Sequence, residues 1–336
     1  MTTRWKDELL LADGAMGTLL FARNAEVATC VELLNVEEPE AVAQAHRDYV
    51  EAGAQIIASN TFAANRVKLA PHELKPRLLE INETGIRLAR SAAKDQAYVA
   101  ASVGPLGALL RPLGSVSDAE ARDIFCEHIA AVASGQPDLL LLETFGSTRE
   151  LLLAIAAAQE AAPRLPLLAS LSVVEDGKTP GGDPLLDAWQ AVADAGADAI
   201  GINCAVGPQV VYDALAPIAG ALDLPLSVMP NAGYPHQLDD RTIYQSSPAY
   251  FKEFAQRFAA LGASIIGGCC GTTPEHTRAM AAALTSRVRI HTPVARPSLP
   301  AVSPRQRIPE MPAGGAARAT AFSQKLGRSF VLTVEV

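Results

Sequence analysis

The chain has 336 residues, of which 49% are hydrophobic and 19% are charged, and its formal net charge is −8. This balance, together with the lack of any basic stripe, excludes a partner bound through a phosphate backbone, so we expect no nucleic-acid partner. No apolar run approaches the roughly 18–20 residues of a membrane span and the first residues hold no apolar signal core, so we expect a cytoplasmic protein with no membrane partner.

Eight apolar runs follow one another along the chain, and each precedes a stretch in which apolar residues recur with helical spacing. Runs of this kind are typical of strands buried on both faces of a parallel sheet. Glycines just before several runs predict left-handed caps on the preceding helices. The expected strands lie within 9–12, 51–62, 98–103, 134–145, 165–173, 194–204, 224–228 and 261–270. The expected helices are 39–51, 73–94, 119–133, 148–161, 185–195, 209–222, 248–261 and 275–284.

This alternation predicts the α/β class, with a (β/α)8 TIM barrel over residues 1–290. A doubly wound open sheet is the alternative, but the count of eight units and the absence of a Gly-x-Gly-x-x-Gly turn favour the barrel. Residues 291–328 are rich in proline and are expected to form an extended linker. Residues 329–336 alternate like a strand, so we expect the start of a second, truncated domain there.

The carboxyl ends of barrel strands converge on one mouth, where three cysteines are expected to meet. Five cysteines in such a chain indicate metal or thiol chemistry rather than a disulfide framework. Cys204, Cys269 and Cys270 could bind one zinc ion and leave its fourth position open. Successive strand residues face opposite ways, so the adjacent pair can share a metal only if the glycines around it bend the backbone. Two buried thiols or a vicinal disulfide are the alternatives.

The other residues at the strand ends are polar. They are Asp13-Gly14, Asn60-Thr61, Gly104, Glu143-Thr144, Asn203 and Asn231. Glu143 follows four leucines and is expected to pair with a substrate ammonium group, with a salt bridge to a barrel arginine as the alternative. The backbone around Asp13 and Gly14 could hold a carboxylate, or form only a tight turn. Cys30 and Cys126 have no strand-end position, and we expect no function for them.

Three thiolates make an electron-rich zinc site that is poorly suited to hydrolysis. Such a site is well suited to binding a fourth thiolate, whose pKa it lowers while the sulfur stays nucleophilic. A thiol, an ammonium group and a carboxylate together describe a sulfur-containing amino acid as the substrate.

At this point five motifs resemble the homocysteine S-methyltransferase family. They are Asp-Gly-Ala-Met-Gly-Thr (13–18), Ser-Asn-Thr-Phe (59–62), Leu-Glu-Thr-Phe (142–145), Gly-Ile-Asn-Cys (201–204) and Gly-Gly-Cys-Cys-Gly-Thr-Thr-Pro-Glu-His (267–276). The similarity runs from about residue 5 to residue 286. It implies a zinc barrel in which a zinc-bound homocysteine thiolate takes a methyl group to give methionine. It implies zinc ligation by Cys204, Cys269 and Cys270, amino-group binding by Glu143, and carboxylate binding by the backbone around Asp13 and Gly14. Asn203 and Thr61 would line the pocket.

The methyl donor stays open between methylcobalamin, methyl-folate and S-methylmethionine. The betaine branch has a tyrosine where this chain has Thr144, which disfavours betaine. Residues 330–336 resemble the first strand of methylenetetrahydrofolate reductase, so the chain is similar to the N-terminal module of a bifunctional protein. A reductase domain, or a cobalamin- or folate-binding domain, would then be a partner.

Two other functions fit the sequence less well. A zinc hydrolase or lyase on the same barrel would need a water-activating base and usually histidine ligands, and His276 begins a helix rather than ending a strand. A non-enzymatic module with structural zinc would need a fourth ligand, and no fourth cysteine is apparent.

Overall fold

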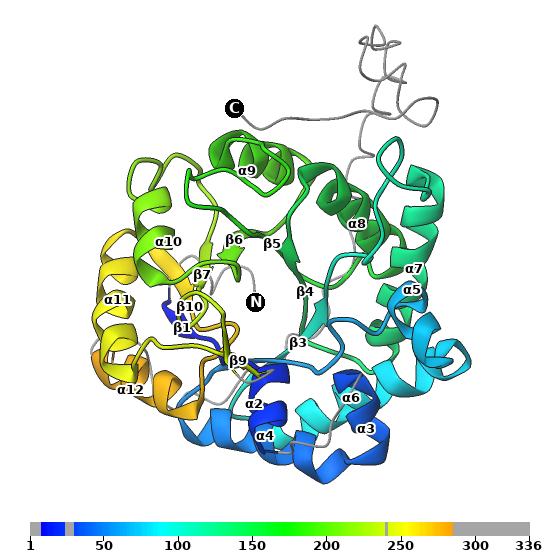
Figure 1. Cartoon of the computed structure of the whole chain (residues 1–336), viewed down its shortest axis with the longest axis horizontal. Coiled ribbons are helices and arrows are strands. Elements are labelled where there is room, and N and C mark those ends of the chain that lie inside the picture. Colours follow the sequence, from blue (N-terminus) through cyan, green and yellow to red (C-terminus); the bar gives the residue numbers. More distant parts are fainter. Residues whose placement is uncertain (1–7, 24–29, 239–240, 285–336) are drawn as a thin grey trace, which may run out of the picture. The chain divides into compact units, whose positions relative to one another are not determined.

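The computed structural model describes residues 8–23, 30–238 and 241–284. Eight strands in these ranges form one parallel sheet, and helices surround it (Figure 1). The order around the sheet is β1 (Leu10–Leu11), β10 (Ala263–Ile266), β7 (Leu226–Met229), β6 (Ala199–Asn203), β5 (Leu167–Leu171), β4 (Leu139–Phe145), β3 (Tyr98–Val103) and β2 (Ile56–Ala58). Apart from the pairing of the first strand, β1, with the last, β10, neighbours in space are neighbours in sequence among these eight strands, as in a barrel.

The seam of the barrel lies between β1 and β2. A parallel bridge pairs Ala12 with Ile56. The Asp13 N–H donates to the Ile56 carbonyl at 3.0 Å, and the Gln55 N–H donates to the Leu11 carbonyl at 2.7 Å. These bonds join the first strand to the second and complete the circle, so the expected (β/α)8 barrel is confirmed.

The helices that follow the strands cover the outside of the barrel. Serine side chains begin three of them: Ser117, Ser147 and Ser247 each accept a hydrogen bond from the backbone N–H three residues later. The helices are α4 (Pro39–Glu51), α6 (Leu78–Ala93), α7 (Asp118–Ser134), α8 (Thr148–Ala161), α9 (Leu185–Asp194), α10 (Pro208–Leu215), α11 (Pro248–Ala260) and α12 (Pro274–Leu284).

Two helix boundaries differ from the expected ones by more than one residue, and proline explains both. The helix expected from residue 73 begins at Leu78, after two short 3-10 turns that contain Pro71 and Pro76. The helix expected to reach residue 222 ends at Leu215, two residues before Pro217. Proline lacks an N–H donor and its ring crowds the preceding turn, so it ends a regular α-helix.

The expected glycine caps are confirmed at three positions and wrong at one. Gly53, Gly196 and Gly262 have φ values of 106°, 89° and 93°. Gly135 has an ordinary right-handed conformation, and Gln136 takes the positive φ instead. The reason for a glycine at 135 is space, because a Cβ there would lie 2.6 Å from the Ile86 Cβ.

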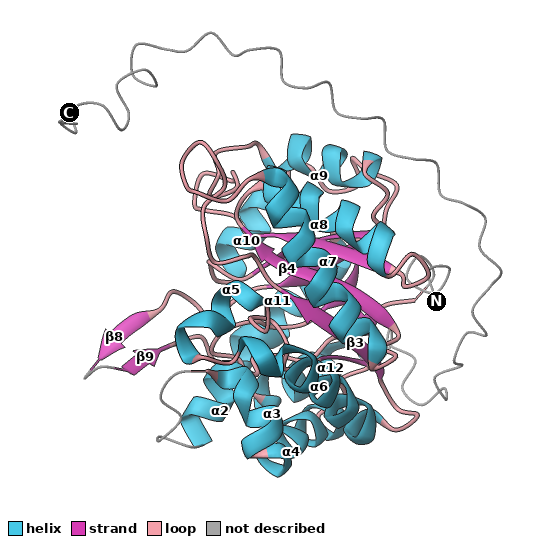
Figure 2. Ribbon diagram, turned by 90° about the vertical axis from the view of Figure 1, so that its right-hand side faces the viewer, coloured by secondary structure: helices cyan, strands magenta, loops and turns pink. Residues whose placement is uncertain are grey.

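Several short elements were not expected from the sequence. They are the helices α2 (Gly17–Arg23), α3 (Leu34–Glu37) and α5 (Arg66–Leu69), the 3-10 turn η1 (Val31–Leu33), and an antiparallel hairpin of β8 (His236–Leu238) and β9 (Arg241–Ile243). The hairpin belongs to the connection between β7 and α11 and stands out from the barrel (Figure 2). None of these pieces is long enough to show a clear apolar period.

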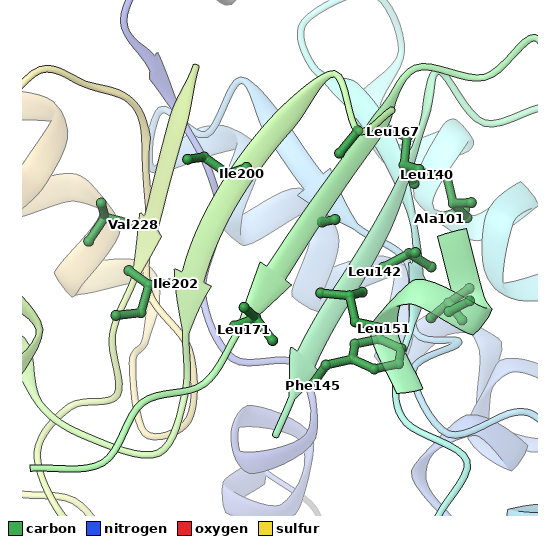
Figure 3. Packing of buried hydrophobic residues seen from close by; sticks show 14 of the residues in the cluster. Ala101, Leu140, Leu142, Phe145, Leu151, Leu167, Leu171, Ile200, Ile202 and Val228 are labelled. Atoms are coloured by element: carbon green, nitrogen blue, oxygen red, sulfur yellow. The ribbon is translucent and has the colours of Figure 1, made fainter. Parts of the chain in front are cut away.

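The barrel wall separates two apolar clusters. Leu140, Leu142 and their neighbours on other strands face the helices, where Phe145 and Leu151 join them (Figure 3). Leu139 and Leu141 belong to the second cluster, with Ala199, Met229 and other strand residues. The alternation along each strand explains the uninterrupted apolar runs, since both faces are buried.

Residues 285–336 lie outside the described ranges. The predicted end of the barrel domain at 290, the proline-rich linker over 291–328 and the strand over 329–336 therefore stay predictions. Within the described ranges, no helix combines the length and the hydropathy needed to cross a membrane.

Candidate metal centre

Three cysteines from two loops meet at the mouth of the barrel. Cys204 follows β6, and Cys269 and Cys270 follow β10. Their sulfur atoms all lie within 4.8 Å of one another. The Sγ atoms of Cys204 and Cys270 are 3.8 Å apart. All five cysteines of the chain are free thiols, so the vicinal disulfide is not present.

The loop after β6 reaches this point through an unusual backbone. Cys204 and Ala205 have φ values of 62° and 63°, in the left-handed region that side chains rarely adopt. Hydrogen bonds to β7 and its loop hold this conformation. The Cys204 N–H donates to the Met229 carbonyl at 3.1 Å, and the Asn231 N–H donates to the Val206 carbonyl at 3.0 Å.

The loop after β10 turns with glycines instead. Its Gly268 N–H donates to the Asp13 carbonyl, and its Cys269 N–H donates to the Pro230 carbonyl. Neither Gly267 nor Gly268 could carry a side chain, because a Cβ would lie 2.8 Å from the Ala12 Cβ or 2.5 Å from the Thr272 Oγ1. The expected bend at the two cysteines is therefore present, and it brings both sulfurs to one side.

The thiols influence one another strongly. Hydrogen bonds from Cys204 and Cys269 lower the pKa of Cys270 to about 3. Hydrogen bonds with Cys204 and Cys270, together with burial, raise the pKa of Cys269 well above its usual range. Thiols this close together share protons through hydrogen bonds, so the three groups titrate as one coupled set.

This set of sulfurs could hold a metal ion. It is the only group of three or more cysteine, histidine or acidic side chains in the described residues whose ligand atoms lie close enough for this. Thiolate sulfur favours soft or borderline metals such as zinc. Cys30 and Cys126 lie elsewhere, in contact with Glu32 and with the Ala157 carbonyl. His276 is also absent from the cluster, because its ring nitrogens bond to Thr273 and to the Ser246 carbonyl.

Glu143 lies in an irregular part of β4. The strand continues to Phe145, the last residue of the range expected for it, and its register with β5 shifts between Leu142 and Phe145. Such bulges change the direction of side chains and are common next to active sites. Thr144, within the bulge, has a φ of 64°.

The Glu143 carboxylate is held by neutral groups. Its Oε1 accepts a hydrogen bond from the Ser102 hydroxyl, and its Oε2 accepts one from Asn203 Nδ2 at 3.2 Å. No arginine or lysine among the described residues forms an ion pair with Glu143, so the salt-bridge alternative finds no support there. Burial raises the pKa of Glu143 to about 7. A half-buried carboxylate that lacks a cationic partner is suited to receive one from a substrate.

Asn203 links the carboxylate to the sulfurs. Its Oδ1 accepts from the Thr144 N–H at 2.8 Å, and its Nδ2 donates to Thr144 Oγ1 at 2.8 Å. The same Nδ2 is 3.8 Å from the Cys269 sulfur. One fully buried amide therefore fixes the β4 bulge and lies between Glu143 and the three cysteines.

The turn after β1 is packed tightly against the loop after β10. A Cβ at Gly14 would lie 2.4 Å from Thr272 Oγ1, and the Ala15 N–H donates to that same oxygen at 3.1 Å. The Asp13 carboxylate is buried and accepts from the Ala58 N–H at 2.8 Å. Its burial raises the pKa of Asp13 well above the usual range. Since the Asp13 and Ala15 amides are already bonded, Gly14 and Met16 carry the amides of this turn that a carboxylate could use.

The side chains of Thr61 and Asn60 form hydrogen bonds within the protein. The Thr61 hydroxyl donates to the Ser102 carbonyl at 2.8 Å and contacts Ser59 Oγ at 2.7 Å. Asn60 Nδ2 donates to the Val31 carbonyl and to Asn35. Thr61 thus supports Ser102, which in turn bonds to Glu143, and its predicted place in the pocket wall stays a prediction.

Two residues of the site were not predicted from the sequence. Ser102 is the penultimate residue of β3 and bonds to Glu143, and Tyr244 follows β9 and packs on Gly271, the residue after Cys270. The inward alternation of β3 could have indicated Ser102, because residues 98 and 100 of the same strand belong to the cluster that faces away from the helices. Nothing in the sequence around Tyr244 indicates its contact, which depends on the connection after β7.

A cavity of about 490 Å³ lies against the two residues that follow Cys204. The Tyr234 hydroxyl donates to Glu175 Oε1 at 2.8 Å within its wall. The lining residues are Val174, Glu175, Asp176, Ala205, Val206 and Tyr234. They come from the loops after β5, β6 and β7, so the cavity opens on the mouth that holds the cysteines.

Comparison with known proteins gives a consistent result. Residues 10–284 match the family described as homocysteine S-methyltransferase. The methionine synthase of Mycobacterium tuberculosis is 34% identical over 295 residues, which cover 83% of this chain and 25% of that protein. The methionine synthase of Mycobacterium leprae is 32% identical, over 82% of this chain and 24% of that protein. The chain therefore spans about a quarter of the length of these relatives.

Solved structures of similar fold include the homocysteine methyltransferase MmuM from Escherichia coli. Its metallated form is 29% identical to this chain, with a TM-score of 0.70, and the match covers 82% of this chain and 96% of that one. Its apo form is 30% identical, with a TM-score of 0.65, over 83% and 97% of the two chains.

Proposed function

The chain belongs to the homocysteine S-methyltransferase family, and we propose that it transfers a methyl group to the sulfur of homocysteine, held as a thiolate on a zinc ion, to give methionine. The observation that carries this proposal is the meeting of three thiols beside the half-buried Glu143 carboxylate, which forms no ion pair with any described arginine or lysine. These groups are complementary to the thiol and the ammonium group of one small amino acid. The family match over residues 10–284 supports the same reaction.

The arrangement of the sulfurs supports zinc. Tetrahedral zinc with zinc–sulfur distances of about 2.3 Å requires sulfur–sulfur distances of about 3.8 Å. The Cys204 and Cys270 sulfurs are already 3.8 Å apart. We propose Cys204, Cys269 and Cys270 as the three ligands. A zinc ion bound in this way supplies a fourth position at which the homocysteine thiol loses its proton near neutral pH while its sulfur stays nucleophilic.

The protein's own side chains are proposed to orient the substrate. Glu143 pairs with the ammonium group, and Ser102 and Asn203 hold the carboxylate of Glu143 in place by hydrogen bonds. The Gly14 amide, in the turn that packs against the cysteine loop, is the candidate contact for the substrate carboxylate. Holding the amino acid at both ends directs its sulfur to the three cysteines, and most of the catalytic effect then comes from positioning.

The methyl donor is proposed to approach from the mouth, over the loops after β5, β6 and β7. The cavity beside Ala205 and Val206 offers space on that side. A small sulfonium donor such as S-methylmethionine would occupy such a space alone. Methylcobalamin or methyl-folate would be presented by another protein module, either in a longer chain or in a separate one.

Methionine formation from homocysteine by the zinc-loaded chain tests the proposal. The donors to compare are S-methylmethionine, free methylcobalamin and methyl-tetrahydrofolate. Turnover with any donor that disappears on zinc removal and returns on zinc addition would support zinc-dependent methyl transfer. Equal turnover by the zinc-free chain would overturn it.

The choice of donor decides the biological role. Turnover with S-methylmethionine would make the barrel self-sufficient. Turnover with methylcobalamin alone would make the barrel one module of a larger methionine synthase, in agreement with its match to a quarter of the mycobacterial proteins. A reductase, cobalamin-binding or folate-binding domain is proposed as the partner only in that second case.

A further inference from the structure

The end of β3 is held, on the side that faces β2, by side chains rather than by the backbone of β2. The backbone pairing of the two strands ends at Ala58 and Ala100. One more backbone bond follows, from the Ser59 N–H to the Ala100 carbonyl at 2.9 Å. Ser102, whose hydroxyl donates to Glu143, therefore lies beyond the backbone ladder between these strands.

Two hydroxyl groups take the place of the ladder at Ser102. The Ser102 N–H donates to Ser59 Oγ at 3.2 Å, and the Thr61 hydroxyl donates to the Ser102 carbonyl at 2.8 Å. The two hydroxyl oxygens lie 2.7 Å apart. Because the single proton of Thr61 Oγ1 is given to a carbonyl, the Ser59 hydroxyl donates to Thr61. The bonds form a closed ring that runs from the Ser102 N–H through both hydroxyls to the Ser102 carbonyl.

The ring is buried and is fixed from its outer side. Ser59, Thr61 and Ser102 are 3%, 0% and 1% exposed. The Thr61 methyl group faces α6, where a Cβ at Gly85 would lie 2.7 Å from Thr61 Cγ2. The Thr61 carbonyl accepts from His128 Nε2, on α7, at 3.0 Å. These contacts hold the Thr61 side chain in the orientation that the ring requires.

The ring determines where the Ser102 hydroxyl points. With both backbone polar groups of Ser102 bonded at the edge of the strand, the side chain faces the inside of the barrel. There it donates to Glu143 Oε1, while Asn203 Nδ2 holds the other oxygen of the same carboxylate. A carboxylate that is already held in place loses little freedom when it binds a cation, and this preorganisation raises the affinity.

We propose that Ser59 and Thr61 are positioning residues of the ammonium site, because the ring that they form with the Ser102 backbone directs the Ser102 hydroxyl to Glu143. This inference rests on the proposed function, since it assumes that Glu143 pairs with the ammonium group of homocysteine. It goes further by giving the two hydroxyls a role in selecting the substrate. They strengthen the preference for a thiol that carries an ammonium group.

Calorimetric titration of the zinc-loaded chain with two thiols tests the inference without turnover. One thiol is homocysteine, and the other is 4-mercaptobutanoate, which keeps the thiol and the carboxylate but lacks the amino group. In Ser59→Ala and in Thr61→Val we expect the affinity for homocysteine to fall about 3–10-fold, the effect of losing a typical hydrogen bond. The affinity for 4-mercaptobutanoate should stay unchanged, because that thiol has no ammonium group for Glu143.

Thr61→Ser separates the hydroxyl from the packing. It keeps the hydroxyl and loses the methyl group that faces Gly85, so it should unfold at lower urea concentration yet keep the full preference for homocysteine. Ser170→Ala and Thr277→Val are the matched controls. Their hydroxyls are fully buried and have no hydrogen-bond partner among the described residues. Both controls are expected to leave the two affinities unchanged.

The outcomes separate this inference from the proposed function. If the unaltered chain binds the two thiols equally, or if Glu143→Gln keeps the preference for homocysteine, the ammonium site itself is wrong and the role of the ring fails with it. If Glu143→Gln loses the preference but Ser59→Ala and Thr61→Val keep it, or weaken the binding of both thiols alike, the ammonium site stands and the inference is overturned. A loss confined to homocysteine, and absent from Thr61→Ser, supports the inference.

Discussion

The two loops that carry the cysteines both turn sharply at the barrel mouth, but the turns have different causes. The loop after β10 has glycines at 267, 268 and 271, and it bends where it carries no side chains. The loop after β6 has no glycine at its turn, yet Cys204 and Ala205 both adopt a left-handed conformation. The first loop is shaped by its own sequence, whereas the second is shaped by its neighbours.

The two turns also differ in backbone strain. A non-glycine residue in the left-handed region costs about 1–2 kcal/mol. Such strain persists only where surrounding contacts impose it, and it is concentrated at functional sites. In the loop after β6 these contacts are the hydrogen bonds to Met229 and Asn231. Cys204 therefore depends on the neighbouring strand β7 for its place at the metal centre.

The largest effect is expected from removing a thiol from either loop. Because both loops are proposed to serve one metal ion, Cys269→Ser and Cys204→Ser should each lose most of the bound zinc and reduce methionine formation by more than about 100-fold, beyond the usual effect of an outer partner. Zinc content by atomic emission and initial rates measure the two effects.

Cys126→Ser is the control for these variants, because Cys126 lies in α7 and contacts the Ala157 carbonyl, away from the three clustered cysteines. It should keep its zinc and its activity. If Cys204→Ser kept full zinc while Cys269→Ser lost it, the loop after β6 would not belong to the metal centre, and the comparison between the loops would lose its basis.

The glycine loop should be the more sensitive of the two to added side chains. Gly271→Ala combines a positive φ with a Cβ 2.2 Å from the Tyr244 ring. Strain and overpacking together should lower the free energy of unfolding by about 2–5 kcal/mol. Urea denaturation gives this value.

Gly262→Ala separates the two causes. Gly262 has a φ of 93° but nothing within 4 Å of its would-be Cβ, so only the strain is expected there, about 1–2 kcal/mol. Equal losses for the two variants would show that the Tyr244 ring gives way easily and that the tight packing at Gly271 has little energetic weight.

Asn203, just before the loop after β6, bonds to Glu143 and so connects this loop to the proposed ammonium site. The contribution of Glu143 can be tested separately from that of the thiols. In Glu143→Gln the charge that pairs with the substrate ammonium is lost, so KM for homocysteine should rise about 10–100-fold at pH 8. Steady-state kinetics at saturating donor measure this, and kcat should change less than KM.

The pH dependence follows from the raised pKa of Glu143, about 7. Below that pH the carboxyl group is increasingly protonated in the free enzyme, and an ammonium substrate must displace the proton to bind. KM should therefore rise as pH falls from 7 to 5, about tenfold per unit from this group. The homocysteine thiol also loses its proton on binding, both in the unaltered protein and in Glu143→Gln. A plot of log KM against pH should therefore have a slope that is smaller by one unit in Glu143→Gln. Identical slopes would remove Glu143 from the ammonium site.

The sequence predicted the parts of this site that depend on local pattern. The eight apolar runs predicted the barrel, and the polar residues after them predicted which side chains gather at its mouth. The motif around Cys269 and Cys270 predicted a bend because three glycines surround the pair. In each case the physical cause lies within a few residues of the feature.

What could not be predicted depends on contacts between distant segments. The left-handed turn at Cys204 is imposed by β7, and the packing of Tyr244 on Gly271 is made by the connection that follows that strand. The bulge at Glu143 and Thr144 is fixed by the Asn203 amide, 60 residues further along the chain. Cys-Ala and Glu-Thr pairs carry no local preference for these conformations, so no reading of the sequence alone would find them.

The smallest predicted effect is a change in the free energy of unfolding, and it is opposite in sign to the change expected for Gly271→Ala in the other loop. Ala205→Gly should stabilise the protein by about 0.5–1 kcal/mol, because relief of left-handed strain outweighs the greater freedom of glycine in the unfolded chain. Ala216→Gly is the control, since Ala216 has an ordinary φ of −54° at the end of α10, and it should destabilise by about 0.5–1 kcal/mol. Urea denaturation of both variants compares them directly. If Ala205→Gly destabilised the protein as Ala216→Gly does, the turn after Cys204 would store no strain. A stabilising Ala205→Gly whose zinc affinity also fell would instead show that the strain serves to hold Cys204 in place for the metal.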